Sequence, residues 1–456
     1  MQTQIFMVHK RHLGLRAPTV LAVGFALTIL VGALVLMLPV SAADGQITPF
    51  LDALFTAASA SCVTGLVTVS TAVHWSVFGK CVILLLIQIG GLGFMSVAAI
   101  ASFVLRRTIT LHERMVMSAG LNLSDGGGIV RLTRRVLFGT FIIEGAGAIL
   151  LSCRFVPHYG FPKGITMGVF HAVSAFCNAG FDLMGTPDDP FQSLIGWAED
   201  PLVNITVMAL IVLGGLGFFV WSDVWDRKCF KRLTLHSKLV LTTSGALLAG
   251  GFVLTLLFEW SNPATLGGMT LPHKLLAAAF QSVTLRTAGF NTIDLGALTG
   301  PSQAVSCLLM FIGGSPGSTA GGIKTVTAAV LVLTAISAFC GRTTVSAFGR
   351  TIAPRSIMNA VTLLMAGGVL CLVGACAIAG IEDAPFHQCL FEAVSAFGTV
   401  GVSMGLTPTL AAASRVILIV MMYMGRVGVL TLGVAVFMRR REPPRLKYPD
   451  ADVFIG

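Results

Sequence analysis

The chain has 456 residues, of which 55% are hydrophobic and only 11% are charged, and its formal net charge is +10. Soluble domains contain roughly 45–50% apolar and about 25% charged residues, so this composition excludes a soluble globular protein. The positive charge does not indicate nucleic acid, because most Lys and Arg residues fall in five clusters separated by long apolar segments. The clusters are 10–16, 106–135, 227–238, 342–355 and 439–447.

Acidic residues lie in the segments between these basic clusters. Such alternation is typical of the positive-inside pattern, in which basic loops face the cytoplasm and acidic loops face outward. We therefore expect a multi-pass membrane protein with paired spans and with both termini in the cytoplasm. The first apolar segment, 17–40, lacks a small-residue cleavage site and is expected to be retained. The acids are Asp182, Asp188, Asp189, Glu199, Asp200, Glu382 and Asp383.

Two short patterns recur four times along the chain in the same order. The first patterns are FTAASASCVTG, FHAVSAFCNAG, AFQSVTLRTAG and FEAVSAFGTVG, which end at Gly65, Gly180, Gly289 and Gly401. The second patterns, LIQIGGLGF, IVLGGLGF, MFIGGSPGS and MYMGRVGVL, follow each of these glycines. We interpret each unit as an outer helix, a half-helix, an extended loop and an inner helix.

The fold class predicted from these repeats is an all-α polytopic membrane protein, with four parallel helix, pore-loop, helix repeats around one pore. The half-helices are too short to cross a bilayer and must return to the outer side. Outer helices are expected near 17–40, 131–154, 237–259 and 357–380, half-helices near 50–61, 165–176, 272–284 and 386–397, and inner helices near 80–105, 201–224, 303–340 and 414–438. The predicted divisions are a cytoplasmic N-terminus 1–16, repeats 17–105, 106–224, 225–340 and 341–438, and a cytoplasmic tail 439–456.

Four extended loops that meet at one axis would suit a small cation. Non-helical backbone survives at membrane depth only where protein buries it or where it lines a wet cavity, and its carbonyl oxygens can replace the hydration shell of potassium. The negative C-terminal dipoles of four half-helices would favour a cation at the same place. A lone glycine more often serves close helix packing, but four in register indicate a filter.

The third inner helix contains the glycine-rich run GGSPGSTAGG at 313–322, which includes Pro316. Glycine costs roughly 1 kcal/mol and proline about 3 kcal/mol relative to alanine in a helix, so we expect a break near mid-membrane. A phosphate-binding loop is excluded, because Ile323 separates glycine from Lys324. Lys324 could repel cations or anchor the loop, and the sequence leaves both open.

Several polar residues stand at membrane depth. We expect Arg426 to reach carbonyls or hydroxyls of the 313–322 run and to hold it closed, rather than to extend to the cytoplasmic surface. Arg286 is expected to point behind the third loop and to hydrogen-bond backbone. Asn178 and Thr287 could supply oxygens to the ion or brace the loops. The isolated acids Glu144 and Glu392 are interpreted as packing or bracing groups.

The four loops, together with LLIQIGGLGF, MFIGGSPGSTAGGIKT and MGRVG, resemble the Trk/Ktr/HKT superfamily of potassium transporters from about residue 15 to about residue 440. The short chain and tail are most similar to the Ktr membrane subunits, the KtrB group. This resemblance implies a relative of tetrameric potassium channels that forms a homodimer in the bacterial plasma membrane. It also implies a cytosolic ring of nucleotide-binding (ATP/ADP) regulatory subunits.

The resemblance assigns filter and gate residues by position. Each loop departs from the TVGYG of potassium channels and only the fourth comes close, so selectivity is expected to be weaker or differently built. The filter residues, where potassium would bind backbone carbonyls, are Cys62, Val63, Thr64, Gly65, Cys177, Asn178, Ala179, Gly180, Arg286, Thr287, Ala288, Gly289, Gly398, Thr399, Val400 and Gly401. The gate residues are Gly313, Gly314, Ser315, Pro316, Gly317, Ser318, Thr319, Ala320, Gly321, Gly322, Lys324 and Arg426.

The function expected from this reasoning is gated potassium uptake under a regulatory subunit, with sodium dependence left open. The alternative is a less selective channel or symporter for sodium or ammonium. A membrane enzyme is disfavoured, because the histidines share no ligand spacing and no nucleophile, metal cluster or carboxylate pair is recognised. Inverted-repeat transport is disfavoured because the repeats run parallel. We expect no covalently bound cofactor and no nucleic acid partner, with potassium as the substrate.

Overall fold

The computed structural model of the chain describes residues 17–93, 129–429 and 431–433. The predicted N-terminus 1–16, the end of the first inner helix beyond residue 93, the basic residues 106–114 and the tail 439–456 lie outside the described residues. Within the described part the chain is almost wholly helical, and the one two-stranded sheet is a short antiparallel hairpin. Its strands are β1 (Ser346–Ala347) and β2 (Arg350–Thr351).

Each of the four units begins with a long apolar outer helix. These four are the described helices that are long and apolar enough to cross a membrane, with a fifth if the bent pair in unit 2 is counted as one span. Many of their large apolar side chains, such as Leu27, Ile142, Leu257 and Leu372, are exposed. Such continuous apolar surface is rare on soluble monomers and suits lipid contact. The outer helices are α1 (Ala17–Leu36), α6 (Ile129–Tyr159), α10 (Leu235–Glu259) and α14 (Pro354–Ile381).

The half-helices form the centre of the molecule. Their second halves are almost completely buried, and Phe55, Phe176, Phe280 and Phe391 are among the largest enclosed side chains. Short 3-10 turns follow in the outer connections at Ile195–Trp197 and Thr407–Thr409, and others lie at Pro39–Ser41 and Phe230–Arg232. The half-helices are α2 (Phe50–Cys62), α7 (Phe161–Phe176), α11 (Leu271–Thr284) and α15 (Phe386–Gly398).

The inner helices differ from one unit to the next. In unit 1, α3 (Val77–Leu92) ends at the edge of the described residues, and unit 4 has α16 (Ala412–Val427). In unit 3 the expected break separates α12 (Gly300–Phe311) from α13 (Thr325–Phe339).

The single span predicted over 201–224 is wrong. In unit 2, α8 (Pro201–Gly215) stops and α9 (Phe218–Arg227) leaves at 92°. Gly217 permits the turn with a φ of 93°, in the left-handed region that favours glycine. The first N–H of α9, that of Phe218, donates to the carbonyl of Gly317 in unit 3 at 2.9 Å.

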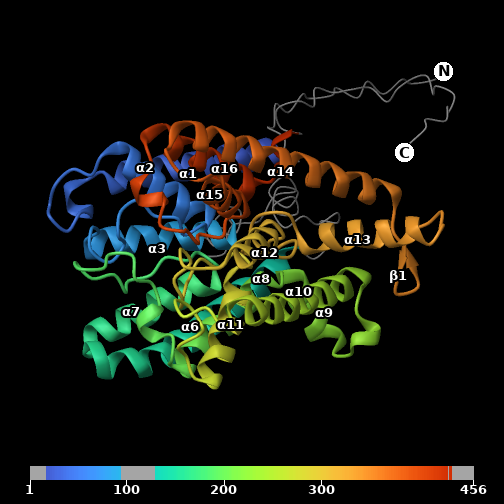
Figure 1. Cartoon of the computed structure of the whole chain (residues 1–456), viewed down its shortest axis with the longest axis horizontal. Helices are drawn as coiled ribbons and strands as arrows, with labels where there is room; N and C mark the ends of the chain where they lie inside the picture. Colours follow the sequence, from blue (N-terminus) through green and yellow to red (C-terminus); the bar gives the residue numbers. More distant parts are fainter. Residues whose placement is uncertain (1–16, 94–128, 430, 434–456) are drawn as a thin grey trace, which may run out of the picture.

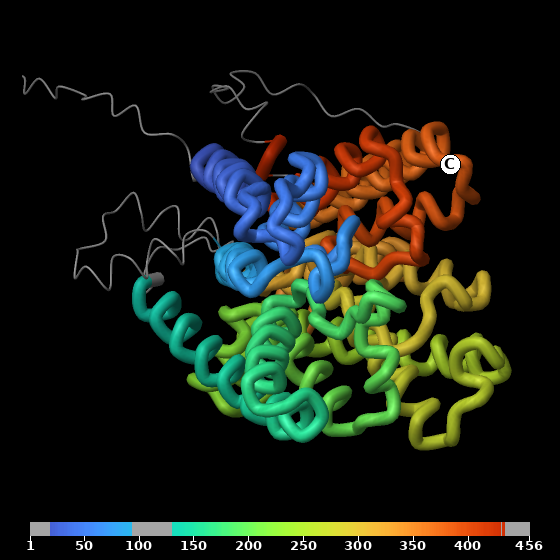
Figure 2. The backbone as a smooth tube through the Cα atoms, turned by 90° about the vertical axis from the view of Figure 1, so that its left-hand side faces the viewer, coloured from blue at the N-terminus to red at the C-terminus, as the bar shows by residue number. Residues whose placement is uncertain are grey.

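The units are arranged around a common centre. Figure 1 shows most helices running along the long axis, and Figure 2 shows the units in order around that axis from blue through green and yellow to red. Units 1 and 4 close the ring through an ion pair between Asp52 and Arg415, whose Oδ1 and Nη1 atoms are 2.7 Å apart. The hydroxyl of Tyr423 also donates to the carbonyl of Ala22 at 2.7 Å.

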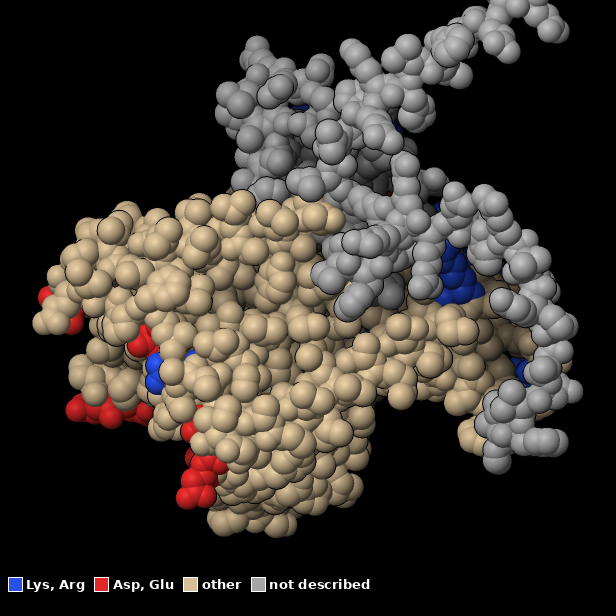
Figure 3. Space-filling model, turned by 90° about the horizontal axis from the view of Figure 1, so that it is seen from above, with Lys and Arg blue, Asp and Glu red and all other residues tan. Residues whose placement is uncertain are grey.

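The two ends of the long axis differ in charge. On the face seen in Figure 3, Asp and Glu gather at the left-hand end, whereas the larger patch of Lys and Arg lies toward the other end. The half-helices start at the acidic end, and the turn between α9 and α10 and the β hairpin lie at the basic end (Figure 1).

Candidate ion pathway

The four loops that follow the half-helices have the same backbone form. We number them loops 1 to 4 (62–65, 177–180, 286–289 and 398–401). Each ends in a glycine of positive φ, at 96°, 68°, 86° and 90° for Gly65, Gly180, Gly289 and Gly401. The residue two places earlier is also left-handed although it carries a side chain, with φ values of 58°, 59°, 69° and 51° at Val63, Asn178, Thr287 and Thr399.

Positive and negative φ therefore alternate through the last three residues of every loop. Alternating handedness turns successive carbonyls toward the same side of an extended chain, whereas a uniform strand points them to opposite sides. A left-handed residue with a Cβ costs roughly 1–2 kcal/mol. The same cost at four equivalent places indicates a conformation imposed by the site.

The four terminal glycines form a closed ring. A Cβ added to Gly65 would lie 3.0 Å from the Cα of Gly180, and one added to Gly180 would lie 2.6 Å from the Cα of Gly289. A Cβ on Gly289 would lie 2.8 Å from the carbonyl oxygen of Val400, and one on Gly401 would lie 2.8 Å from the Cα of Gly65. Side chains longer than hydrogen therefore do not fit at the ring without displacing a neighbouring loop.

Hydroxyl groups near the half-helix ends brace three of the loops, and sequence reasoning missed them. The hydroxyl of Ser59 accepts the N–H of Gly65 at 3.0 Å, and that of Ser395 accepts the N–H of Gly401 at 3.2 Å and donates to Val402 at 2.7 Å. In loop 3, Thr284 donates to the carbonyl of Phe290. Ser174 of α7, the helix that precedes loop 2, has no hydrogen-bond partner among the described residues. The serine that recurs in the half-helix pattern was the sequence signal from which these braces could have been predicted.

Polar side chains behind loops 2 and 3 link these loops to other segments, within unit 3 for Arg286 and between units 2 and 3 for Asn178. The Arg286 guanidinium donates to the carbonyls of Ser244 (3.4 Å) and Gly313 (3.2 Å), so it points to an outer helix and to the break in unit 3. The Asn178 amide lies 3.4 Å from the hydroxyl of Thr319, and 3.5 Å from that of Thr287. These contacts are of the bracing kind.

The two isolated acids also make bracing contacts. Glu144 accepts two hydrogen bonds from the amide of Gln88, at 2.8 and 3.1 Å, and one from the thiol of Cys177 at 3.8 Å. The same thiol also lies 3.2 Å from the Gln88 oxygen. This cluster joins the inner helix of unit 1 to loop 2, and Gln88 was not recognised from the sequence. Glu392 accepts hydrogen bonds from Ser403, Thr407 and the N–H of Met404.

A cavity of about 390 Å³ opens above the glycine ring. Its floor includes all four terminal glycines, and its charged lining residues within the described chain are Asp182, Asp189 and Asp294. Burial raises the pKa of Asp182 to about 6, although the Met184 N–H and Ser193 lower it in part. Acidic groups without lysine or arginine in the lining make this outer vestibule attractive to cations.

The glycine-rich segment of unit 3 lies on the opposite side of the ring, and we call residues 312–324 the break loop. A Cβ on Gly313 would lie 3.2 Å from the Thr287 side chain, and one on Gly322 would lie 3.2 Å from the Cα of Gly398. A parallel bridge between Ile312 and Ile323 closes the loop at its base. The break loop therefore lies directly against loops 3 and 4.

Besides Arg286, which donates to the carbonyl of Gly313, two further cations hold the break loop: Arg426 from unit 4 and Lys324 at the end of the loop itself. Arg426 donates to the carbonyl of Thr319 in that loop and, from its other nitrogen, to the carbonyls of Gly90 and Gly91 in α3, the latter at 3.2 Å. Lys324 donates to the carbonyl of Ala320 at 2.6 Å, which is an anchoring contact. Arg426 thus joins the inner helices of units 4 and 1 to the break in unit 3.

Comparisons with known proteins agree with this architecture. The family described as TrkH, a cation transport protein, matches residues 10–442. "Ktr system potassium uptake protein B" of Bacillus subtilis is 43% identical over 96% of each chain, and "Potassium/sodium uptake protein NtpJ" of Enterococcus hirae is 41% identical over 96% of each chain. The structure titled potassium transporter TrkH from Vibrio parahaemolyticus superposes with a TM-score of 0.72, covering 94% of this chain and 86% of that one at 17% identity.

Proposed function

This chain belongs to the TrkH family of cation transport proteins, and we propose that it takes up potassium across a bacterial membrane as the membrane subunit of a Ktr-type system. The names of its two similar relatives support potassium as the transported ion. The proposed path runs from the acidic vestibule through the ring of loops 1 to 4 and past the break loop.

The observation that carries this proposal is the fourfold repetition of one loop conformation around the glycine ring. Loops 1 to 4 would supply carbonyl oxygens in place of the ion's water, as dehydrated potassium requires. The half-helices end at these loops, so their C-terminal dipoles would add negative potential there. Asn178, Thr287 and the brace hydroxyls would hold the loops rather than bind the ion.

We further propose that the break loop obstructs the path and that Arg426 stabilises its closed position. Support comes from its place against loops 3 and 4 and from the Arg426 hydrogen bond to Thr319. Control would come from a partner, since relatives are named as parts of a Ktr system. A homodimer and a nucleotide-binding regulatory ring are the assembly we propose, with both termini on the cytoplasmic side.

Uptake by purified protein in liposomes tests the proposal. We would measure potassium, rubidium, sodium and ammonium uptake for the wild type and for Gly65→Ser and Gly401→Ser. Gly45→Ser is the matched control, because Gly45 also has positive φ (71°) but a Cβ there would meet nothing within 4 Å. We expect both ring variants to lose potassium uptake or its preference over sodium, and the control to retain it. Unchanged uptake in folded ring variants would contradict the assignment of the path.

Sodium is the second candidate substrate. One relative is named as a potassium/sodium uptake protein, and none of the four loops contains the tyrosine of TVGYG. The same liposome experiment separates the candidates, because comparable sodium and potassium uptake in the wild type would favour the less selective channel.

A further inference from the structure

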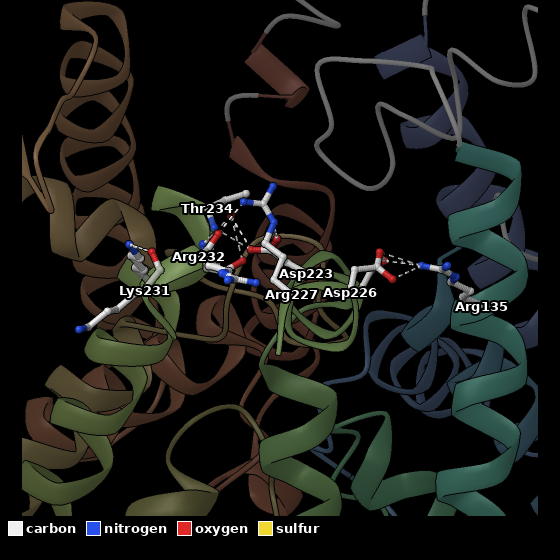
Figure 4. Close-up of polar contacts among 10 residues, drawn as sticks. Arg135, Asp223, Asp226, Arg227, Lys231, Arg232 and Thr234 are labelled. Carbon is white, nitrogen blue, oxygen red and sulfur yellow. Dashed lines mark hydrogen bonds and ion pairs between the residues drawn. The ribbon is translucent and has the colours of Figure 1, made fainter. Parts of the chain in front are cut away.

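Helix α9 contacts two membrane-spanning helices, α10 at its N-terminus and α6 near its first turns. Thr234, the N-cap of α10, donates its N–H (2.9 Å) and its hydroxyl (2.8 Å) to the carboxylate of Asp223. Three residues further along α9, Asp226 pairs with Arg135 of α6 at 3.0 Å. Figure 4 shows these two acids reaching neighbouring helices from the one short segment. Because α9 stands at 92° to α8, it runs across the span direction at the level where α10 begins.

The exposed part of this segment combines aromatic and basic side chains. Residues 224–232 are all exposed, and Trp225 is exposed by 78%. The segment continues into the turn with Lys228, Phe230, Lys231 and Arg232. No ion pair joins Lys228, Lys231 or Arg232 to a carboxylate in the part of the chain that the structure describes. A short amphipathic helix with tryptophan, followed by a turn that carries several cations, suits an element that lies in the membrane interface.

The hairpin of unit 4 extends the same surface. The rings of Phe230 and Phe348 are 6.1 Å apart, and the Lys238 ammonium lies 5.9 and 5.8 Å from their centroids. Residues 341–355, which contain β1 and β2, include three arginines and no acidic residue. We define the interfacial surface as residues 225–232 together with the hairpin residues 346–351.

We propose that the interfacial surface binds the headgroups of anionic phospholipids. Its cations without carboxylate partners complement the phosphate charge, and its exposed aromatic rings suit the headgroup level of a bilayer. Its position beside the start of α10 places it where a headgroup would be. Helix α9 connects this surface to the proposed gate, because Phe218 at the start of α9 donates its N–H to the carbonyl of Gly317 in the break loop.

Quenching of tryptophan fluorescence by brominated lipid tests the binding directly. The full-length protein is placed in vesicles of phosphatidylglycerol and phosphatidylcholine, in which one or the other lipid carries the bromine. The difference between wild type and Trp225→Phe isolates the Trp225 signal. We expect brominated phosphatidylglycerol to quench Trp225 more than brominated phosphatidylcholine does. Equal quenching by the two lipids would overturn the proposal.

Charge removal then tests which cations are responsible. Lys228→Gln with Lys231→Gln should reduce the preference for phosphatidylglycerol by about fivefold for each charge removed. Lys163→Gln with Lys274→Gln is the matched control, since it removes two charges near the acidic end. An unchanged preference in the first pair, or an equal loss in both, would contradict the proposal. Loss of regulator binding with an intact lipid preference would instead assign this surface to a protein partner.

A second measurement tests whether the interfacial surface affects transport, and this test rests on the proposed function. Potassium uptake should rise with phosphatidylglycerol content in the wild type and in the control pair, but not in Lys228→Gln with Lys231→Gln. An equal rise in all three proteins would remove the link to the gate. Absence of uptake in every vesicle, with the quenching preference retained, would count against the proposed function and leave the lipid site standing.

Discussion

The outer half of the molecule, which contains the half-helices and loops 1 to 4, repeats four times. The inner half, which contains the ends of the inner helices and the break loop, varies between the units in the part of the chain that the structure describes. Loops 1 to 4 share one backbone conformation, but α8 turns away, the third inner helix is broken, and Arg426 occurs in unit 4 alone among the repeat motifs. A cation held by carbonyls needs equivalent oxygens on all sides. A gate needs one element that moves and one that restrains it, so the inner half does not have to be symmetric.

The two halves are also held together differently. Loops 1 and 4 are braced within their own units, by Ser59 and Ser395. The break loop is held by Arg286 of its own unit and, in addition, by contacts from other units, through Phe218 and Arg426. Changes in the outer half should therefore affect which ion passes, and changes in the inner half should affect how often any ion passes.

The largest effect is expected from breaking the symmetry of the ring at Gly289. In Gly289→Ala the new Cβ would lie 2.6 Å from the Cα of Gly180, so loop 2 or loop 3 must move. We expect potassium uptake to fall about 100-fold in liposomes, because a displacement near 1 Å can cost that much at a preorganised site. Gly45→Ala is the control, since Gly45 has a φ of 71° with nothing within 4 Å. Equal uptake by the two variants would refute the closed ring.

The symmetric outer half is also the part that the sequence predicts well. All four half-helices and outer helices lie within a few residues of their expected ranges, because apolar segments separated by short patterns reveal a repeat directly. The bend after α8 could not be predicted in this way. Units 1 and 2 share the letters GGLGF, and Gly93 and Gly217 have similar positive φ values of 83° and 93°. The direction that α9 takes after Gly217 is accompanied by a hydrogen bond to Gly317, about 100 residues later, which no local pattern reports.

The residues of the candidate site also fall into those that the sequence predicts and those that it does not. The residues of loops 1 to 4 were identified by register, and the hydrogen bond between Arg426 and Thr319 follows the expectation that a membrane-buried cation needs carbonyl partners. The cluster of Gln88, Glu144 and Cys177 was missed. Its members come from two helices, α3 and α6, and from loop 2, so no spacing within one segment of the sequence indicates that they meet.

The second prediction concerns the inner half. Arg426→Gln should raise potassium uptake in the absence of any activator by about tenfold, because hydrogen bonds from a charged donor contribute roughly 1.5–3 kcal/mol. The preference for potassium over sodium should not change. Arg154→Gln, which breaks an exposed ion pair with Asp200, is the control and should leave uptake unaltered.

Deletion of residues 314–320 tests whether Arg426 acts through the break loop. The deletion alone should raise uptake, and adding Arg426→Gln to it should raise uptake no further, because both changes remove the same restraint. Additive increases would show that Arg426 acts elsewhere, through its contacts with Gly90 and Gly91.

The third prediction tests the braces of the outer half. Ser395→Ala removes the hydrogen bonds to Gly401 and Val402. Loss of the equivalent of one such bond, about 1 kcal/mol, from the free-energy difference between bound potassium and bound sodium would lower the potassium preference about fivefold while uptake itself persists. Ser174→Ala is the matched control from α7, where the equivalent hydroxyl has no partner among the described residues. A preference lowered equally in both variants would mean that helix packing, and not the brace, sets selectivity.

The smallest effect is expected in the outer vestibule. Because this cavity lies before the glycine ring, a change there should alter how many cations reach the ring and not which cation passes through it. Burial raises the pKa of Asp182 to about 6, so this carboxyl is charged at about pH 7.5 and neutral at about pH 5. Asp189 and Asp294 line the same cavity. As the external pH falls through about 6, potassium uptake below saturation should fall about twofold, because one attracting charge is lost.

Asp182→Asn should abolish that pH dependence and give the lower uptake at every pH. Asp188→Asn is the control, because Asp188 is exposed and does not line the vestibule, and its uptake should follow the wild-type curve. The potassium to sodium ratio should stay constant in all three proteins, since the charge acts before the ion reaches the glycine ring. A potassium to sodium ratio that changes with pH would mean that Asp182 affects the conformation of loops 1 to 4 directly. The vestibule would then influence ion selectivity as well as the local cation concentration.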